Sequence, residues 1–210
     1  MKRLYSLCRR CLLDGDIGKL TSEQKTHVKT IESVAANLTE TVGLLMDATK
    51  LRTGSLRAKR KPIDLDDLFR DVLNVIDPKA KVKGVVFTKK IQSDLPNTIL
   101  DKRLVRMTLM NLLSNAIKYT PTGSNVSLEV EVSNNKLKYV VKDEGCGILE
   151  DEHDLIFSQL YRASNASNIH GNGLGLYVAK GAVEELGGKI NFISKENEGT
   201  EFRVEIPLES

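Results

Sequence analysis

The sequence predicts an α+β fold, a two-layer sandwich with helices on one face of a mixed sheet, preceded by an α-helical hairpin. Apolar and polar residues alternate in segments 126–132, 137–141 and 202–206, which is the pattern of half-buried strands. Apolar residues recur every three or four positions in segments 28–49 and 105–116, which is the pattern of amphipathic helices. Because each element has one apolar face, helices and strands are expected to bury these faces against each other in two layers.

Residues 1–55 are expected to form the hairpin, with a short apolar helix at 4–13 as its first arm. The longer arm carries a heptad seam that suits an antiparallel bundle or coiled coil. This seam consists of Val28, Ile31, Ala35, Leu38, Val42, Leu45 and Thr49. Thr21 and Gln24 form a capping box at the start of the longer helix, and Gly54 suits its end.

Residues 56–62 are expected to link the hairpin to a second domain, 63–210. The basic cluster in this linker predicts a solvated hinge rather than a binding patch. It consists of Arg57, Lys59, Arg60 and Lys61. Asp64 can cap the first helix of the second domain. The apolar face of that helix consists of Leu65, Leu68, Phe69, Val72 and Ile76. A strand is expected at 85–91, and Asn134 with Asn135 offers a hairpin turn.

A polar stripe runs along the helix predicted around 105–118. Asn111, Asn115 and Lys118 are four and three positions apart, so they share one face beside the apolar face that would bury against the sheet. Carboxamide oxygens are hard ligands that suit Mg²⁺, and a lysine ammonium beside them can offset phosphate charge. The stripe therefore indicates a nucleotide site, with a solvated polar face as the alternative.

A carboxylate and two glycines follow the strand predicted at 137–141. Asp143 stands at the strand end, and Gly145 and Gly147 follow it in DEGCGI. A carboxylate there can accept a hydrogen bond from the exocyclic amine of adenine, and the glycines let backbone and ligand approach closely. A simple turn is the alternative, because glycine is common in loops.

A second glycine-rich segment precedes the last predicted helix, 177–186. Gly171, Gly173 and Gly175 occur in GNGLGL, and backbone amides where a loop enters a helix can hold phosphates. The spacing is neither the GxGxxG of dinucleotide-binding folds nor the GxxxxGK of Walker loops. Residues 164–170, rich in Ser and Asn, suit a mobile lid.

Together these segments resemble the ATP-binding catalytic domain of sensor histidine kinases, within the family shared by gyrase, Hsp90, histidine kinases and MutL. NLLSNAIKYTP resembles the N-box, DEGCGI the first glycine box, IFSQLYRAS the F-box, GNGLGL the second glycine box and EGTEFRVEIP the last. All five occur in the family's order, so the resemblance is specific.

The resemblance implies ATP and Mg²⁺ as cofactors. Asn115 and Asn111 would hold Mg²⁺ and the phosphates, Lys118 would contact phosphate, and Tyr119 would lie against the adenine whose amine Asp143 reads. Catalytic roles are implied for Asn115, Lys118 and Arg162, of which Arg162 would either reach the γ-phosphate on lid closure or remain a surface residue. Further nucleotide contacts are implied for Gly145, Gly147, Ile148, Tyr161, Gly171, Gly173, Leu174, Gly175, Leu176 and Thr200.

The family's phosphoacceptor motif, a histidine followed by an acidic residue and an Arg-Thr-Pro-like segment, does not occur in the sequence. By register it would fall about two helical turns before Met1, so we expect the chain to lack its own acceptor. His27 lacks the neighbours of that motif and is expected to be an exposed helical residue. His153 is expected at a solvated helix start and His170 beside the lid.

Composition gives weaker indications about metal binding, partners and location. Cys8 and Cys11 form a CxxC without a second pair, which favours small apolar bundle residues, with a redox pair as the alternative, and argues against zinc. A net charge of +3 gives no reason to expect nucleic acid, and no segment is long and apolar enough for a membrane span. Three cysteines without a signal peptide fit a cytoplasmic location.

The resemblance thus implies an ATP-dependent histidine kinase core that passes a phosphoryl group to a histidine and then to the receiver domain of a response regulator. The hairpin also predicts a possible homodimer. Two alternatives stay open, a noncatalytic ATP-binding module that binds a partner's helical bundle and a protein-serine kinase of the anti-sigma type. The heptad hairpin has no place in the serine kinase interpretation.

Overall fold

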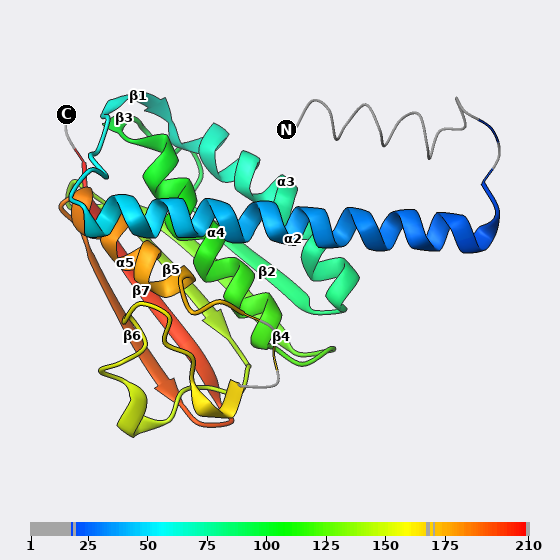
Figure 1. Cartoon of the computed structure of the whole chain (residues 1–210). Helices are drawn as coiled ribbons and strands as arrows, with labels where there is room; N and C mark the ends of the chain where they lie inside the picture. The colour runs from blue at the N-terminus through cyan, green and yellow to red at the C-terminus, as the bar shows by residue number, and fades with distance from the viewer. Residues whose placement is uncertain (1–17, 19, 167–168, 170, 209–210) are drawn as a thin grey trace. The chain divides into compact units, whose positions relative to one another are not determined.

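The structure, a computed structural model, describes residues 18, 20–166, 169 and 171–208 (Figure 1). The chain divides into two compact units, residues 1–45 and residues 46–210. The predicted helix 4–13, with Cys8 and Cys11, lies outside the described residues.

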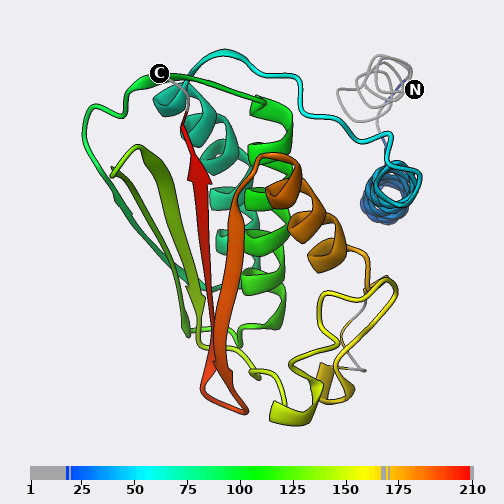
Figure 2. The same ribbon diagram turned by 90° about the vertical axis from the view of Figure 1, so that its left-hand side faces the viewer.

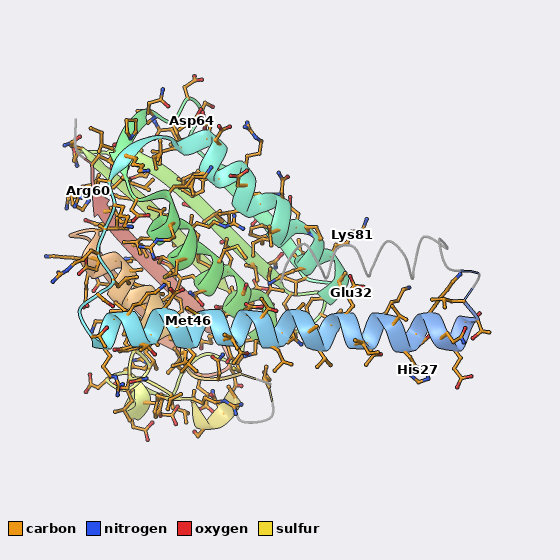
Figure 3. All side chains as sticks on the ribbon, turned by 45° about the horizontal axis from the view of Figure 1, so that its top comes forward. His27, Glu32, Met46, Arg60, Asp64 and Lys81 are labelled. Carbon is orange, nitrogen blue, oxygen red and sulfur yellow. The ribbon has the colours of Figure 1, made fainter. Side chains whose placement is uncertain are left out.

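Helix α2 (Ser22–Arg52) forms the described part of the first unit and continues into the second. The predicted capping box is present, since the N–H of Thr21 donates to Oε1 of Gln24 at 2.9 Å and the N–H of Gln24 donates to Oγ1 of Thr21 at 3.2 Å. His27 is exposed as predicted and lies 3.8 Å from the carboxylate of Glu23 (Figure 3). The seam residues Ile31, Leu38, Val42 and Leu45 are each more than half exposed.

A five-stranded mixed sheet organises the second unit. Its order is β2 (Val86–Ile91), β4 (Asn125–Ser133), β5 (Lys136–Asp143), β7 (Gly199–Pro207) and β6 (Lys189–Lys195). The pair β2–β4 is parallel and the other pairs are antiparallel. Tight turns join β4 to β5 and β6 to β7, which makes these two pairs antiparallel. A separate two-stranded sheet pairs β1 (Lys61–Asp64) with β3 (Asn97–Leu100), and the sequence did not predict it.

Three helices cover one face of the large sheet, as Figure 2 shows, and complete the predicted two-layer sandwich. They are α3 (Leu65–Lys83), α4 (Lys102–Tyr119) and α5 (Gly175–Glu185). Asp64 caps α3 by accepting a hydrogen bond from the N–H of Asp67 at 3.0 Å, and all five apolar residues predicted for this helix are buried. Two short 3₁₀ helices, η1 (Glu150–Glu152) and η2 (Ser164–Ala166), lie between β5 and α5.

The β4–β5 turn fixes the register that the site depends on. Asn134 and Asn135 have φ values of 53° and 56°, the left-handed conformation that a two-residue hairpin turn requires and that asparagine tolerates. In this register Leu137, Tyr139 and Val141 point to the helices and are buried. The same alternation places Asp143 at the end of β5 on the helix-covered side of the sheet.

Part of the segment predicted to be a solvated hinge lies against the end of α5, although Arg57, Lys59 and Lys61 of its basic cluster are exposed. Leu56 is only 2% exposed, and the N–H of Ala58 donates to Oε2 of Glu185 at 3.3 Å. The guanidinium of Arg60 donates to the carbonyl of Leu186 at 3.3 Å. The prediction followed the positive charges and overlooked Leu56, the apolar residue that anchors the segment.

Gly181 lies inside α5, where glycine normally costs stability. A Cβ on this residue would lie 2.4 Å from Cδ2 and 2.7 Å from Cδ1 of Leu51, in the last turn of α2. Both residues line a pocket of about 280 Å³. The glycine therefore makes room for the Leu51 side chain.

Gly181→Ala is expected to lower the free energy of unfolding by up to about 2 kcal/mol, because overpacking against Leu51 exceeds the gain in helix propensity. In a Leu51→Ala background the same change should instead stabilise the protein by about 1 kcal/mol. Urea unfolding of the four variants measures this coupling. Equal effects of Gly181→Ala in both backgrounds would show that the two positions do not meet.

Candidate functional site

The polar stripe of α4 faces the start of α5. The apolar face of α4 is fully buried, which leaves Asn111 and Asn115 half-buried on its other side. The Nδ2 of Asn111 donates to the carbonyl of Met107 at 2.9 Å, so its Oδ1 is the atom presented outward. A Cβ on Gly175, the first residue of α5, would lie 3.1 Å from that oxygen and 3.7 Å from Nδ2 of Asn115. The two predicted amides therefore meet at the N-terminus of α5.

Lys118 lies beside the first glycine of GNGLGL. Its Nζ donates to the hydroxyl of Tyr119 at 3.1 Å and lies 4.5 Å from the centre of the Tyr119 ring. A Cβ on Gly171 would lie 2.6 Å from this Nζ. The ammonium thus occupies the space that a side chain at Gly171 would need, and it lies on the same side of α4 as the two amides.

Asp143 is only 6% exposed, at the far end of the site from α5. Its Oδ1 accepts hydrogen bonds from the N–H of Gly145 at 2.9 Å and from the N–H of Thr200 at 3.3 Å. Burial raises the pKa of this carboxyl to about 6, and the two hydrogen bonds oppose that shift. A Cβ on Gly145 would lie 2.7 Å from this Oδ1 and 2.9 Å from the carbonyl of Tyr119. Tyr119 therefore connects the two ends of the site, since its hydroxyl contacts Lys118 and its carbonyl lies against the loop after Asp143.

The loop after Asp143 packs tightly on β6. Gly147 has a φ of 64°, and a Cβ there would lie 2.0 Å from the carbonyl oxygen of Lys195. The buried Ile148 donates its N–H to Oγ of Ser194 at 2.9 Å. Glycine is required at position 147 both for its backbone conformation and for this close approach.

Two residues that hold this loop were not predicted to do so, although Asn165 lies in the segment predicted as the lid. Ser194 in β6 bonds to Ile148 and Thr200, and Asn165 in η2 donates to the carbonyls of Cys146 and Gly147 at 3.3 and 3.2 Å. Neither residue belongs to a glycine-rich motif. Only the strand pairing of β6 with β7 identifies Ser194, because that pairing sets it opposite Thr200.

The segment before α5 is held by Arg162 and Gly173. The guanidinium of Arg162 donates to the carbonyls of Ile169 and Ala166 at 2.8 and 3.4 Å. Gly173 has a φ of 67°, and a Cβ there would lie 2.7 Å from the carbonyl oxygens of Leu160 and Tyr161. Leu174 is buried, while Tyr161 and Leu176 are half-buried. The structure thus bonds the Arg162 side chain to carbonyl groups of the predicted lid, residues 164–170.

The expectation for His153 is confirmed for the short helix and wrong for the solvated side chain, which is half-buried. Its ring packs edge-on against Phe192 with centroids 5.0 Å apart, and its Nε2 lies 3.3 Å from the carbonyl oxygen of Ile148. A short 3₁₀ helix begins before it as expected, but the ring turns inward because β6 offers an aromatic partner. His170 lies outside the described residues.

Comparison with known proteins decides the family. The profile of the histidine kinase-, DNA gyrase B- and HSP90-like ATPases matches residues 100–210. The chain belongs to this family. The resemblance predicted from the five motifs is therefore confirmed, and so is the fold class.

Similar proteins of this ATPase family include sensor kinases. The chain is 34% identical to the signal transduction histidine-protein kinase BarA of Escherichia coli K12, over 95% of this chain and 23% of BarA. It is 32% identical to the sensor protein GacS of Pseudomonas syringae, over 90% of this chain and 22% of GacS. The chain thus spans less than a quarter of the length of these relatives.

Solved structures agree with the observed fold. The catalytic domain of histidine kinase ThkA covers 71% of this chain with a TM-score of 0.62 at 27% identity, and 95% of that domain is matched. Full-length ShkA in complex with AMPPNP covers all of this chain with a TM-score of 0.75 at 24% identity, and 45% of ShkA is matched. At 24% identity, the similarity to ShkA shows a shared fold only.

Between residues 20 and 208, leaving aside the undescribed positions, none of the helices combines the length and hydropathy that a membrane crossing requires. In the same part of the chain, three or more His, Cys, Asp or Glu side chains never gather as a metal site.

Proposed function

We propose that this chain is the catalytic core of a histidine kinase, which binds Mg²⁺ and ATP and transfers the γ-phosphoryl group to a histidine. From there the group passes to an aspartate in the receiver domain of a response regulator. The observation that supports this proposal is the convergence of Asn111 and Asn115 on Gly175, with Lys118 beside Gly171. The Oδ1 of Asn111, the side-chain amide of Asn115, an ammonium and a helix N-terminus face one space, which is the chemistry that phosphates require.

The two ends of the site suit different parts of ATP, so they would set the orientation in which it binds. Asp143 is the buried acceptor that suits the adenine amine, and the free N–H groups of the first turn of α5 suit the phosphates. Tyr119 reaches both ends, so its ring suits the base while its hydroxyl stays with Lys118. Ile148, Thr200, Leu174 and Leu176 would complete the walls.

The residues present fit Mg²⁺ only together with phosphates. Asn111 presents its Oδ1 outward because its Nδ2 is bonded to Met107, and Asn115 lies one turn further along the same face. No cluster of carboxylates accompanies them in the described part of the chain. Mg²⁺ is commonly held by one or two protein oxygens plus substrate phosphates, and when bound it offsets the charge on the phosphoryl group.

The chain's own groups then act mainly by positioning. Lys118 would neutralise a phosphate oxygen, and the segment 164–170 would close over the phosphates and exclude water. We propose that Arg162 moves with that segment and reaches the γ-phosphate. The reacting groups would be held in line, which supplies most of the catalysis in phosphoryl transfer. The exposed seam on α2 is proposed to pair with a second copy of the chain.

Phosphoryl transfer can be tested directly. The chain is incubated with Mg²⁺ and γ-labelled ATP, alone and with a helical hairpin that carries a phosphoacceptor histidine. We expect acid-labile label on the supplied hairpin only. Label on the chain alone would locate an acceptor within it, and ATP binding without any label would favour the noncatalytic module. Label stable to acid would point to a serine kinase.

A further inference from the structure

Three polar residues form a row across the end of the large sheet. Asp143 in β5 pairs with Thr200 in β7, and Thr200 pairs with Ser194 in β6. Directly opposed residues of antiparallel strands place their side chains on the same face, so all three side chains lie on the helix-covered side. Asp143 and Thr200 are 6% and 7% exposed, and Ser194 is half-buried.

Ser194 has more hydrogen-bond partners than protons. Its Oγ lies 2.9 Å from the N–H of Ile148, 3.0 Å from the carbonyl oxygen of Gly199 and 2.8 Å from Oγ1 of Thr200. The N–H can only donate and the carbonyl can only accept. A serine hydroxyl has one proton, so all three contacts are satisfied when Ser194 donates to Gly199 and accepts from both Ile148 and Thr200.

This assignment fixes the hydrogen-bonding role of the Thr200 hydroxyl. Its single proton is used toward Ser194, so its remaining lone pairs can only accept. The carboxylate of Asp143, one strand away in the same row, is also an acceptor. This end of the candidate site therefore carries two acceptors on neighbouring strands, which suit an amino group with two N–H donors and repel a carbonyl oxygen.

We infer that Ser194 is a specificity-determining residue that acts through Thr200, making the base pocket select 6-aminopurine over 6-oxopurine nucleotides. The inference rests on the proposed function, because it takes Asp143 to read the adenine amine. Ser194 is a positioning residue in this scheme and need not touch the base. Without its hydroxyl, Thr200 is free to turn its proton toward a carbonyl at position 6 of the purine.

The experiment compares ATP with ITP, which carries a carbonyl in place of the amine. Affinities of both nucleotides in the presence of Mg²⁺ are measured by calorimetry for the unmodified chain, Ser194→Ala and Ser194→Thr. We expect the unmodified chain to prefer ATP and Ser194→Ala to reduce the ATP-to-ITP affinity ratio by about fivefold to tenfold, the size of one neutral hydrogen bond. Ser194→Thr keeps the hydroxyl and should keep the ratio.

Matched variants distinguish a change in base specificity from a general weakening of nucleotide binding. Asn191→Ala, an exposed position in the same strand, should leave the ratio unchanged. In a Thr200→Val background, Ser194→Ala should have no further effect on the ratio, because the hydroxyl it orients is gone. A Ser194→Ala variant that weakens ATP and ITP equally would overturn the inference and leave the proposed function standing. An unmodified chain that binds neither nucleotide would overturn both.

Discussion

Asn115→Ala is expected to slow phosphoryl transfer to a supplied histidine hairpin by about two to three orders of magnitude, the usual cost of removing one well-placed polar group at a charged transition state. Asn115 is half-buried one helical turn from Asn111, and both side chains lie close to the first residue of α5. Alanine is the best helix former, so α4 should keep its stability within about 0.5 kcal/mol. The loss should therefore be catalytic and not structural.

The measurement is the initial rate of labelling at saturating ATP, with unfolding curves as the check on the fold. Asn191→Ala is the matched control, since it removes an exposed asparagine from β6, away from the site. Affinity for adenosine, which has no phosphates, should be the same in Asn115→Ala as in the unmodified chain. A rate within tenfold of the unmodified chain would remove Asn115 from the catalytic machinery.

Elements with a regular pattern and a local end signal were predictable from the sequence. The capping residues Thr21 and Asp64, the Asn134–Asn135 turn and the alternation in β5 and β7 each act through neighbours in the chain. The polar stripe of α4 was predictable for the same reason, because helical spacing alone places Asn111, Asn115 and Lys118 together. These local rules were enough for the fold class and for most of the candidate site.

Features that depend on long-range pairing were not predictable. Strands β1 and β3 are four residues each, too short for a clear alternation, and they exist because 61–64 meets 97–100. Ser194 looks like any strand residue until β6 pairs with β7. His153 was assigned from its acidic neighbours, whereas Phe192, far along the chain, decides its place. In each case the deciding contact joins segments whose meeting has no local signature.

Asp143→Asn is expected to stabilise the nucleotide-free protein while weakening ATP binding. The folded pKa of Asp143 is about 6 against an ordinary value of 3.8, because burial disfavours the charged form. The native state therefore binds more protons than the unfolded state between these values, so stability is lost as pH rises through this window. At pH 8 the loss amounts to about 3 kcal/mol, at 1.36 kcal/mol for each pKa unit. Asparagine does not titrate and avoids this loss.

The same substitution should weaken ATP binding by about 30- to 100-fold, the worth of a hydrogen bond to a charged group. An asparagine can still accept hydrogen bonds from Gly145 and Thr200 through its Oδ1. Its NH₂ group would then face the amino group of adenine, and two donors cannot form a hydrogen bond with each other. In the unmodified chain, ATP affinity should fall as pH drops below about 6, since the carboxylate must be charged to accept well. In Asp143→Asn that dependence should disappear.

Urea unfolding and ATP calorimetry at pH 5 and pH 8 measure both effects on the same samples. Asp71→Asn is the matched control, because Asp71 is exposed and its bond to Lys102 lowers its pKa, so its removal should give no stabilisation at pH 8. A variant that gains stability and keeps its ATP affinity would place the base away from Asp143. A variant that loses stability at pH 8 would mean that the negative charge strengthens the hydrogen bonds from Gly145 and Thr200 by more than burial of that charge costs. The opposite effects on stability and binding have one cause. The charged Asp143 carboxylate is buried away from water, and only a hydrogen bond from the nucleotide can offset the free energy lost by its desolvation.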